Sequence, residues 1–404
     1  MINHNSILFA LLIPFLNLIS LSGCAKNSGK LTGYYPAYHA RFQSPENIPW
    51  SIYSQLSFSF ASPHLDGSFT YPPGLDAQKF NVLAPRFVKE AKQHKVKACI
   101  SYGGWTGSRD FSKMVANEPN RVKYAKMLID YSKKFEFECM DIDWEFPNAA
   151  GIGCNSFDKS DVELRKQWPK ATYTAAFAVG GLIGASGGLA TQEETKLLIE
   201  NLDTVKMMVY DVFGVYSKTT GPLSPIRGTC APENPASVES SLVAFTKMGF
   251  KSNQLSLGLA GYGRSYELLS PTIVPRKVVN YLSYFYQNHT GKAPEGGKTD
   301  DPQMIDVCGV DTPRAGIWLV KELIEKGYLS EDQSKGQNGY KRTKDDCSGQ
   351  SFLTNGKYFF SYDDKDSMIA KINYIKKKNI HQAYVFDTLG HPDAILKSVN
   401  DALA

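Results

Sequence analysis

Short apolar segments recur along the chain, and most of them are separated by segments with the spacing of amphipathic helices. Eight apolar segments predict strands: Leu31–Tyr35, Gln55–Ala61, Val96–Tyr102, Phe137–Asp143, Ala171–Val179, Val205–Tyr210, Leu255–Gly261 and Gln382–Phe386. Helical periodicity is found at Gln78–Gln93, Val122–Lys134, Gln192–Asn201, Ser237–Met248 and Ser367–Lys378, and Pro392 begins a last helix towards Ala402. Strands alternating with helices form a parallel sheet, either doubly wound or closed. Eight such units favour an α/β fold of the (β/α)8 TIM-barrel type.

The connection after the seventh predicted strand is too long for a barrel loop. Residues 265–357 contain several tyrosines, a helical segment at Gly316–Gly327 and a polar tract rich in Gly, Lys and Asp. Loops of this length without secondary structure are uncommon in compact domains. We therefore expect a small α+β insertion domain at 265–357, with the barrel formed by residues 26–264 and 358–404.

The first 25 residues differ in character from the rest. Ile7–Leu21 is an apolar run followed by small residues, and residues 1–25 contain no Lys or Arg. The run is short for a membrane span but has the length of the apolar part of a signal peptide, so we expect a secreted, extracellular protein without stable membrane insertion. The alternative is a membrane anchor, because Leu21–Cys24 also resembles a bacterial lipobox that would attach a lipid at Cys24. Association with a cell wall is compatible with either.

Composition and charge narrow the class of protein without naming a function. The 404 residues are 42% apolar and 21% charged, which is typical of a globular protein. The formal net charge is +5 and no block of Lys or Arg occurs, so we expect no nucleic-acid partner. We expect a monomer.

The cysteines agree with export. None of the spacings matches a zinc motif, and we expect no metal site. Cys99 and Cys139 lie in predicted strands and are expected to be buried thiols. The loop cysteines are candidates for two disulfides, Cys154 with Cys230 and Cys308 with Cys347. Asn288 begins the one Asn-x-Thr/Ser sequon and is a candidate glycosylation site.

Three carboxylic side chains follow one another along the fourth predicted strand. Because strand side chains alternate between faces, Asp141, Asp143 and Glu145 project to one side. Carboxylates this close together cannot all ionise at low cost, so at least one pKa is expected to rise. A carboxyl group that stays protonated near neutrality is suited to general acid catalysis. The alternative, a solvated acidic face on an edge strand, is disfavoured by the apolar residues that alternate with the acids.

The segment Glu138–Glu145 resembles the strand-four signature Asp-Gly-x-Asp-x-Asp-x-Glu of glycoside hydrolase family 18, the chitinases. Four further segments are similar to family motifs and occur in the family order: Ser101–Gly104 (Ser-x-Gly-Gly), Met208–Asp211 (Met-x-Tyr-Asp), Leu257–Arg264 (the Tyr-Gly-Arg segment) and Ser361–Asp364 (the stretch that re-enters the barrel). The similarity extends over nearly all of residues 31–402 and includes an insertion domain that walls one side of the cleft.

The resemblance implies hydrolysis of β-1,4-linked N-acetylglucosamine polymers without a cofactor, and chitin or chito-oligosaccharides as partners. Glu145 would be the general acid and base, while the acetamido oxygen of the substrate acts as nucleophile and configuration is retained. Asp143 would bind the acetamido N–H. Asp141 would share a proton with Asp143, and Ser101 would hydrogen-bond behind them.

Further residues are implied in substrate binding. Tyr210 and Asp211 would position the acetamido group, and Met208 would form part of the apolar floor. The aromatic residues Tyr34, Trp105 and Tyr262 stand at the mouth of the predicted barrel, Arg264 completes the Tyr-Gly-Arg segment, and Phe386 occupies the place beneath the reacting sugar.

The chain departs from the family pattern at several positions. Glu138 replaces Asp, Cys139 replaces Gly, Lys206 stands where many members have Gln, and Phe386 replaces the usual Trp. The fourth helix, limited to Asp158–Gln167, is shorter than usual in the family.

Two other functions are compatible with the same fold. A lectin that binds chitin without turnover is the first, favoured by Cys139 and Phe386 and disfavoured by the retained Glu145. The second is an endo-β-N-acetylglucosaminidase that acts on glycoprotein glycans. The insertion at 265–357 disfavours it, because those relatives often lack that domain.

Overall fold

The structure, a computed structural model, describes residues 31–149, 151, 166–231, 236–278 and 280–404. The predicted signal peptide and most of the predicted fourth helix lie outside the described residues. In the described part of the chain, no helix combines the length and the apolar character that a membrane span requires.

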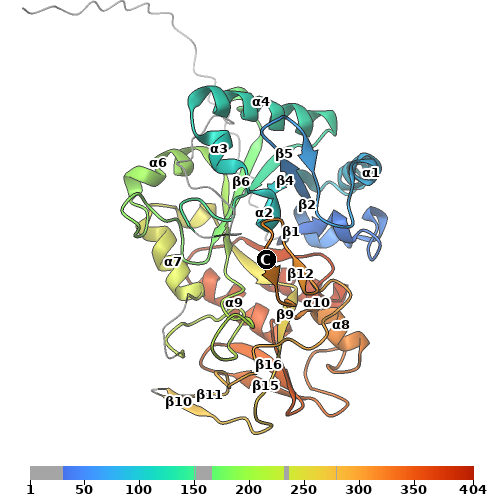
Figure 1. The fold of residues 1–404 in the computed structure, drawn as a ribbon, viewed down its shortest axis with the longest axis vertical. Coiled ribbons are helices and arrows are strands. Elements are labelled where there is room, and N and C mark those ends of the chain that lie inside the picture. The colour runs from blue at the N-terminus through green and yellow to red at the C-terminus, as the bar shows by residue number, and fades with distance from the viewer. Residues whose placement is uncertain (1–30, 150, 152–165, 232–235, 279) are drawn as a thin grey trace, which may run out of the picture.

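Eight parallel strands form a closed barrel, as the sequence predicts (Figure 1). Their order is β1-β18-β8-β7-β6-β5-β4-β2, and pairing of β1 with β2 closes the ring. The bounds are β1 Leu31–Pro36, β2 Tyr53–Pro63, β4 Lys97–Gly103, β5 Cys139–Asp143, β6 Thr172–Ala178, β7 Thr204–Met208, β8 Leu255–Ala260 and β18 Ala383–Phe386. Each overlaps one of the eight predicted strands. A short strand, β3 (Phe69–Thr70), pairs antiparallel with the end of β2.

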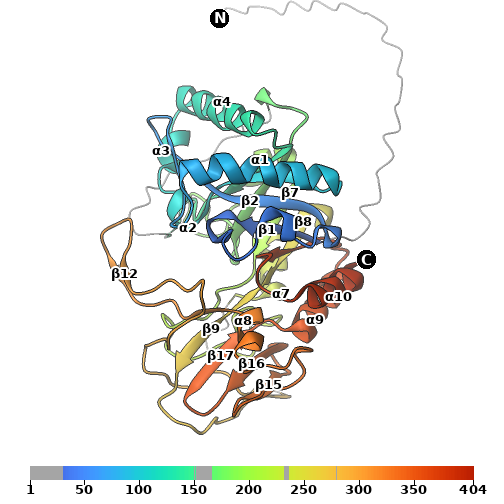
Figure 2. The same cartoon turned by 90° about the vertical axis from the view of Figure 1, so that its right-hand side faces the viewer.

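Helices connect the barrel strands and cover their outer face (Figures 1 and 2). The long ones are α1 Ala77–Gln93, α4 Glu118–Lys134, α6 Gln192–Asn201, α7 Val238–Lys247, α9 Lys365–Lys376 and α10 Asp393–Leu403. Two short helices, α2 (Gly104–Gly107) and α3 (Phe111–Val115), follow β4. Polar N-caps begin several of the long helices; the side chain of Asp76, for example, accepts a hydrogen bond from the Lys79 backbone N–H at the start of α1.

The insertion after β8 contains a five-stranded antiparallel sheet in the order β14-β9-β17-β16-β15, which lies below the barrel in Figure 1. The bounds are β9 Tyr262–Glu267, β14 Ile317–Leu319, β15 Lys341–Asp345, β16 Gln350–Thr354 and β17 Tyr358–Tyr362, with helix α8 at Val320–Glu325. The sheet therefore begins and ends a few residues outside the predicted limits of the insertion. Gly316–Gly327, predicted to be helical, is helical only at Val320–Glu325, because Ile317–Leu319 form β14 and pair with β9.

Two hairpins extend from the insertion. One consists of β10 (Arg276–Val278) and β11 (Tyr281–Ser283), and the other of β12 (Met304–Ile305) and β13 (Asp311–Thr312). The second hairpin extends from the insertion towards the side of the barrel where α2 lies (Figure 2). A hydrogen bond of 3.3 Å from Arg109 Nη1 to the carbonyl of Val307 connects the two parts.

The main apolar core lies between the barrel strands and their helices, and large side chains such as Phe58, Phe80 and Phe87 are fully buried there. The barrel interior is different, because its side chains are largely polar: Ser57, Ser101, Asp141, Thr174 and Lys206 are at most 1% exposed and linked by hydrogen bonds and an ion pair. The fold therefore excludes water from a polar column that ends at the carboxyl ends of the strands.

Candidate active site

The acidic residues of β5 lie inside the barrel on one line, as the alternation of the strand predicts. Asp141 and Asp143 are buried, and Glu145 follows the end of the strand and is half-buried. Gly103 on β4 lies so close to this strand that a Cβ there would be 2.1 Å from the carbonyl oxygen of Asp143. Its φ of 103° is also one that favours glycine. The Ser-x-Gly-Gly segment thus lets the backbone pass beside the acidic strand.

Asp141 is held by three donors at the base of this line. Its Oδ2 accepts from Ser101 Oγ at 2.8 Å, and its Oδ1 accepts from Thr174 Oγ1 and lies 3.0 Å from Lys206 Nζ. Burial alone would raise the pKa of Asp141. The Lys206 ammonium and the hydrogen bonds outweigh burial and hold the pKa of Asp141 below its ordinary value. Asp141 is therefore a fixed carboxylate.

Asp143 and Glu145 are perturbed in the opposite direction. Burial, followed by the charges of Glu145 and Asp141, raises the pKa of Asp143 well above its ordinary value. Burial, followed by the charge of Asp211, raises the pKa of Glu145 to about 8. The described part of the chain offers Asp143 Oδ1, which is buried, no hydrogen-bond partner. These two upper carboxyl groups therefore keep a proton to higher pH than an ordinary carboxyl group does.

The predicted proton sharing between Asp141 and Asp143 has no counterpart among the hydrogen bonds of the described residues, where Asp141 instead accepts from Ser101 and Thr174. Ser101 has the hydrogen-bonding position predicted for it. Its side chain is fully buried, so it cannot touch a substrate.

Asp211 lies at the wall of the site and is connected to the two residues of the Tyr-Gly-Arg segment. Its Oδ2 accepts from the Tyr262 hydroxyl at 2.7 Å, and its Oδ1 accepts from Arg264 Nε at 2.6 Å. Asp211 has a φ of 54°, in the left-handed region. The neighbouring Tyr210 shares a hydrogen bond of 3.0 Å with the hydroxyl of Tyr384 on β18. The structure brings these predicted residues together beside Glu145.

Aromatic rings form the floor of the site. Phe386, half-buried, lies 6.1 Å from the ring of Tyr210 in a stacked arrangement and 5.3 Å from the ring of Tyr34 in an edge arrangement. Met208 and Tyr262 belong to the same cluster. Tyr34 is only 1% exposed and has Lys206 Nζ 4.0 Å above its ring, so the predicted contact of Tyr34 with substrate is wrong for this conformation. Tyr34 supports the floor from beneath.

Trp105 is the prominent exposed ring near the carboxyl ends of the strands. It lies on α2 and is 50% exposed, with Phe146 at 6.4 Å as an edge-on neighbour. Trp144, directly before Glu145, is buried against Phe111.

The disulfides differ from the predicted pairs. The structure joins Cys230 to Cys347, across the barrel and the insertion sheet, and Cys308 is also disulfide-bonded. Cys154 lies outside the described residues. Cys99 and Cys139, predicted to be thiols, form a disulfide, because β4 and β5 pair with these two residues opposite each other. The pairing depends on strand register and tertiary contacts, which loop composition does not reveal.

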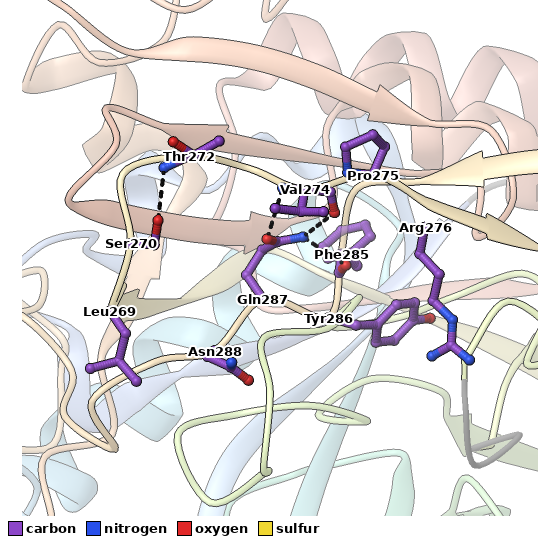
Figure 3. Close-up of a pocket in the computed structure, with 10 residues that line it drawn as sticks. All are labelled: Leu269, Ser270, Thr272, Val274, Pro275, Arg276, Phe285, Tyr286, Gln287 and Asn288. Atoms are coloured by element: carbon purple, nitrogen blue, oxygen red, sulfur yellow. Dashed lines mark hydrogen bonds between the residues drawn. The ribbon is translucent and has the colours of Figure 1, made fainter.

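A cavity of about 430 Å³ lies in the insertion between Leu269 and Asn288 (Figure 3). The Gln287 amide joins its two sides by accepting from the Val274 N–H at 3.0 Å and donating to the Val274 carbonyl at 2.9 Å. None of the acidic residues of β5 lines this cavity. The exposed side chain of Asn288, the sequon residue, lies at its edge.

Among the described residues, no group of three or more His, Cys, Asp or Glu side chains is arranged to hold a metal ion. The chemical groups of the site are instead a fixed carboxylate, two carboxyl groups with raised pKa values, tyrosine hydroxyls and an aromatic floor. These groups are suited to proton transfer to a neutral, ring-shaped substrate.

Comparison with known proteins agrees with this geometry. Residues 30–388 match the family described as Glycosyl hydrolases family 18. A protein named "chitinase-like effector" from Moniliophthora roreri is 32% identical over 377 residues, which are 90% of each chain.

Solved structures share the fold. A chitinase from Rhizomucor miehei matches with a TM-score of 0.77 and 22% identity, over 92% of this chain and 99% of that one. A family 18 chitinase from Cycas revoluta, solved in complex with (GlcNAc)3, matches with a TM-score of 0.69 and 18% identity, over 93% of this chain and all of the other.

Proposed function

The chain belongs to the glycosyl hydrolases of family 18, and from this premise we propose that it is a chitinase that hydrolyses β-1,4 bonds between N-acetylglucosamine units. The observation that carries the proposal is the position of Glu145 at the end of the buried acidic strand, where burial and the charge of Asp211 raise its pKa to about 8. A carboxyl group with this pKa is protonated at neutral pH and can donate its proton to a leaving oxygen.

Glu145 acts first as acid and then as base. It protonates the glycosidic oxygen while the acetamido oxygen of the substrate forms a bond to the anomeric carbon, and the bond from that carbon to the leaving oxygen breaks. The Glu145 carboxylate then takes a proton from the water that attacks the oxazolinium ion, which opens the ring and restores the acid. The configuration at the anomeric carbon is retained because two displacements occur.

Asp143 supports this step through its buried, unpartnered oxygen. As a carboxylate, that oxygen accepts the acetamido N–H and offsets the positive charge of the oxazolinium ion. The acetamido group also lies against Tyr210, Asp211 and Met208, and Phe386 faces the apolar side of the sugar ring. Trp105 extends the binding surface, in keeping with the trisaccharide bound by the related chitinase of Cycas revoluta.

A second candidate function, chitin binding without turnover, is favoured by two observations. The relative from Moniliophthora roreri carries the name of an effector. In addition, Asp141 is paired with Lys206, which departs from the family pattern at its position.

Incubation with chito-oligosaccharides and with a high-mannose glycoprotein separates the candidates. Release of chitobiose from the former supports the chitinase. Binding to chitin beads without release of sugar supports the lectin. Release of glycans from the glycoprotein, without cleavage of the chito-oligosaccharide, would indicate the endoglycosidase.

We also propose that the protein is secreted, since the disulfides Cys99–Cys139 and Cys230–Cys347 require an oxidising compartment. N-terminal sequencing of the exported protein tests this, with Lys26 expected as the first residue. Asn288, exposed beside the insertion cavity, is then expected to carry a glycan in a eukaryotic host, and digestion with a glycosidase specific for N-linked glycans should lower the mass.

A further inference from the structure

Lys206 is a positive charge in the interior of the barrel. It lies on β7, and its side chain is 1% exposed. The residues two positions before and after it, which face inward on the same strand, are not charged. A buried ammonium is stable only when it is paired and hydrogen-bonded. Lys206 Nζ lies 3.0 Å from Asp141 Oδ1 and donates to Ser57 Oγ at 3.0 Å. The residue is therefore built into the acidic site.

The other titratable groups around Lys206 are rings and a second carboxyl. The ring centroids of Tyr34 on β1 and Tyr384 on β18 lie 4.0 and 5.8 Å from Nζ. Asp143 on β5 interacts electrostatically with the ammonium at longer range. Within the described residues, Asp141 is the carboxylate at ion-pair distance, so Lys206 and Asp141 form a neutral pair.

This pairing determines what Asp141 can do for its neighbour. Its two oxygens accept hydrogen bonds from Ser101 and Thr174, and the Lys206 ammonium and the Tyr34 hydroxyl also act on it as donors. A carboxylate in these contacts carries no proton that it could donate to Asp143. Asp143 is thus left with one oxygen that has no partner among the described residues.

We propose that Lys206 is a positioning residue that keeps Asp141 ionised, so that only Asp143 and Glu145 exchange protons during the reaction. The inference rests on the proposed function for its catalytic consequence, but the ionisation of Asp141 is a property of the free protein. When Asp143 is ionised, its negative charge and its free oxygen are available to the substrate, because neither is shared with a protonated Asp141.

Removal of the charge should reverse this arrangement. Lys206→Met keeps a long apolar side chain and leaves Asp141 as a buried carboxylate without a counter-ion. Asp141 then takes up a proton near neutral pH, because burial disfavours the charged form. A protonated Asp141 can donate a hydrogen bond to Asp143, which stabilises the Asp143 carboxylate and lowers its pKa.

The first test is the pH dependence of kcat/KM on a soluble chito-oligosaccharide. The acid limb reports protonation of Asp143, and Lys206→Met should move it to lower pH by about one unit or more. Lys371→Met is the matched control, because Lys371 and Asp363 form another fully buried ion pair that makes no contact with Asp141 or Asp143. Lys371→Met should lower the stability of the protein and leave the pH of the acid limb of kcat/KM unchanged. An unshifted acid limb in a folded Lys206→Met protein overturns the inference.

The second test needs neither substrate nor turnover. Infrared spectroscopy in D2O distinguishes protonated from ionised buried carboxyl groups. At neutral pH, Lys206→Met or Lys206→Gln should show a carboxylic acid band that a further Asp141→Asn change removes. With Lys206 in place, Asp141→Asn should leave the carboxylic acid bands unchanged. If Asp141→Asn removes a band there, Asp141 is protonated beside Lys206 and the inference is wrong, whether or not the Lys206 variants fold.

The two tests separate two kinds of failure. A wild-type protein that hydrolyses no oligosaccharide contradicts the proposed function, while the infrared bands still decide the role of Lys206.

Discussion

Arg264 Nε lies 2.6 Å from Asp211 Oδ1 at the wall of the acidic site, and the charge of this Asp211 is the largest influence on the pKa of Glu145 after burial. The ion pair therefore sets how much of the Asp211 charge acts on the proposed general acid. Glu145 must be protonated to act, so the rate falls as the pH rises through its pKa.

Asp211→Asn should lower the pKa of Glu145 from about 8, because it removes the nearby negative charge. The basic limb of kcat/KM should then move to lower pH, and the rate should also fall because the acetamido group loses a contact. The measurement is the pH profile on a soluble chito-oligosaccharide.

Arg264→Met removes the positive partner of the same ion pair and should have the opposite effect on the pKa of Glu145. It leaves Asp211 charged and uncompensated, so the basic limb should move to higher pH. A shift of both variants in one direction would contradict the assignment of the basic limb to Glu145.

Asp143→Asn should separate catalysis from stability. The amide is nearly isosteric but cannot offset the positive charge of the oxazolinium ion, so kcat should fall roughly 100-fold or more. The fold should tolerate the change, because a buried carboxyl with an unpartnered oxygen gives way to a neutral group. Turnover and the thermal midpoint are to be measured on the same preparation. Wild-type rates in the variant would rule out acetamido assistance.

The disulfide between Cys230 and Cys347 should contribute strongly to stability, since the two residues are 117 positions apart. Closing a loop of this length is worth about 4 to 5 kcal/mol in the chain-entropy model. Replacing both cysteines with serine should therefore lower the free energy of unfolding by an amount of this order. Peptide mapping without reduction should recover a fragment that links them, and a fragment that links Cys230 to another cysteine would show that the pairing is wrong.

Replacing Phe386 tests the aromatic floor. Phe386→Ala removes the ring that lies between Tyr34 and Tyr210 and should weaken oligosaccharide binding by about 1 to 2 kcal/mol, or roughly 5- to 30-fold. Phe386→Trp keeps a ring and should retain binding. Calorimetry with an oligosaccharide measures both, and equal affinities of the Ala variant and the wild type would place the sugar elsewhere.

Much of the barrel could be predicted from the sequence because parallel strands covered by helices are short apolar runs between amphipathic segments. Period-two alternation also placed Asp141 and Asp143 on one inward face. The same alternation also indicates a contact between Cys99 and Cys139, which the sequence analysis does not predict. Cys99 and Cys139 each stand two residues before an inward residue of a hydrogen-bonded pair, Ser101 and Asp141, so a contact between the cysteines could have been expected.

Other features depended on contacts between distant segments. Lys206 departs from the family pattern, but the sequence does not indicate its partner, because β5 and β7 meet around one interior only in the folded barrel. The burial of Tyr34 had no signal in its own strand, because the residues that cover it come from other strands. The predicted pairing of the loop cysteines is wrong for the same reason, because contacts between distant segments determine which cysteines meet.

The central claim is that Glu145 is the acid of a working hydrolase, and one substitution tests it most directly. Glu145→Gln cannot donate a proton, so the release of chitobiose from a chito-oligosaccharide should fall by a factor of about 100 to 10,000. Binding of the same oligosaccharide should persist. Glu138→Gln is the matched control, because Glu138 is exposed just before β5, and it should hydrolyse at the wild-type rate. If Glu145→Gln releases chitobiose as fast as the wild type and Glu138→Gln, Glu145 is not the acid and the account is wrong.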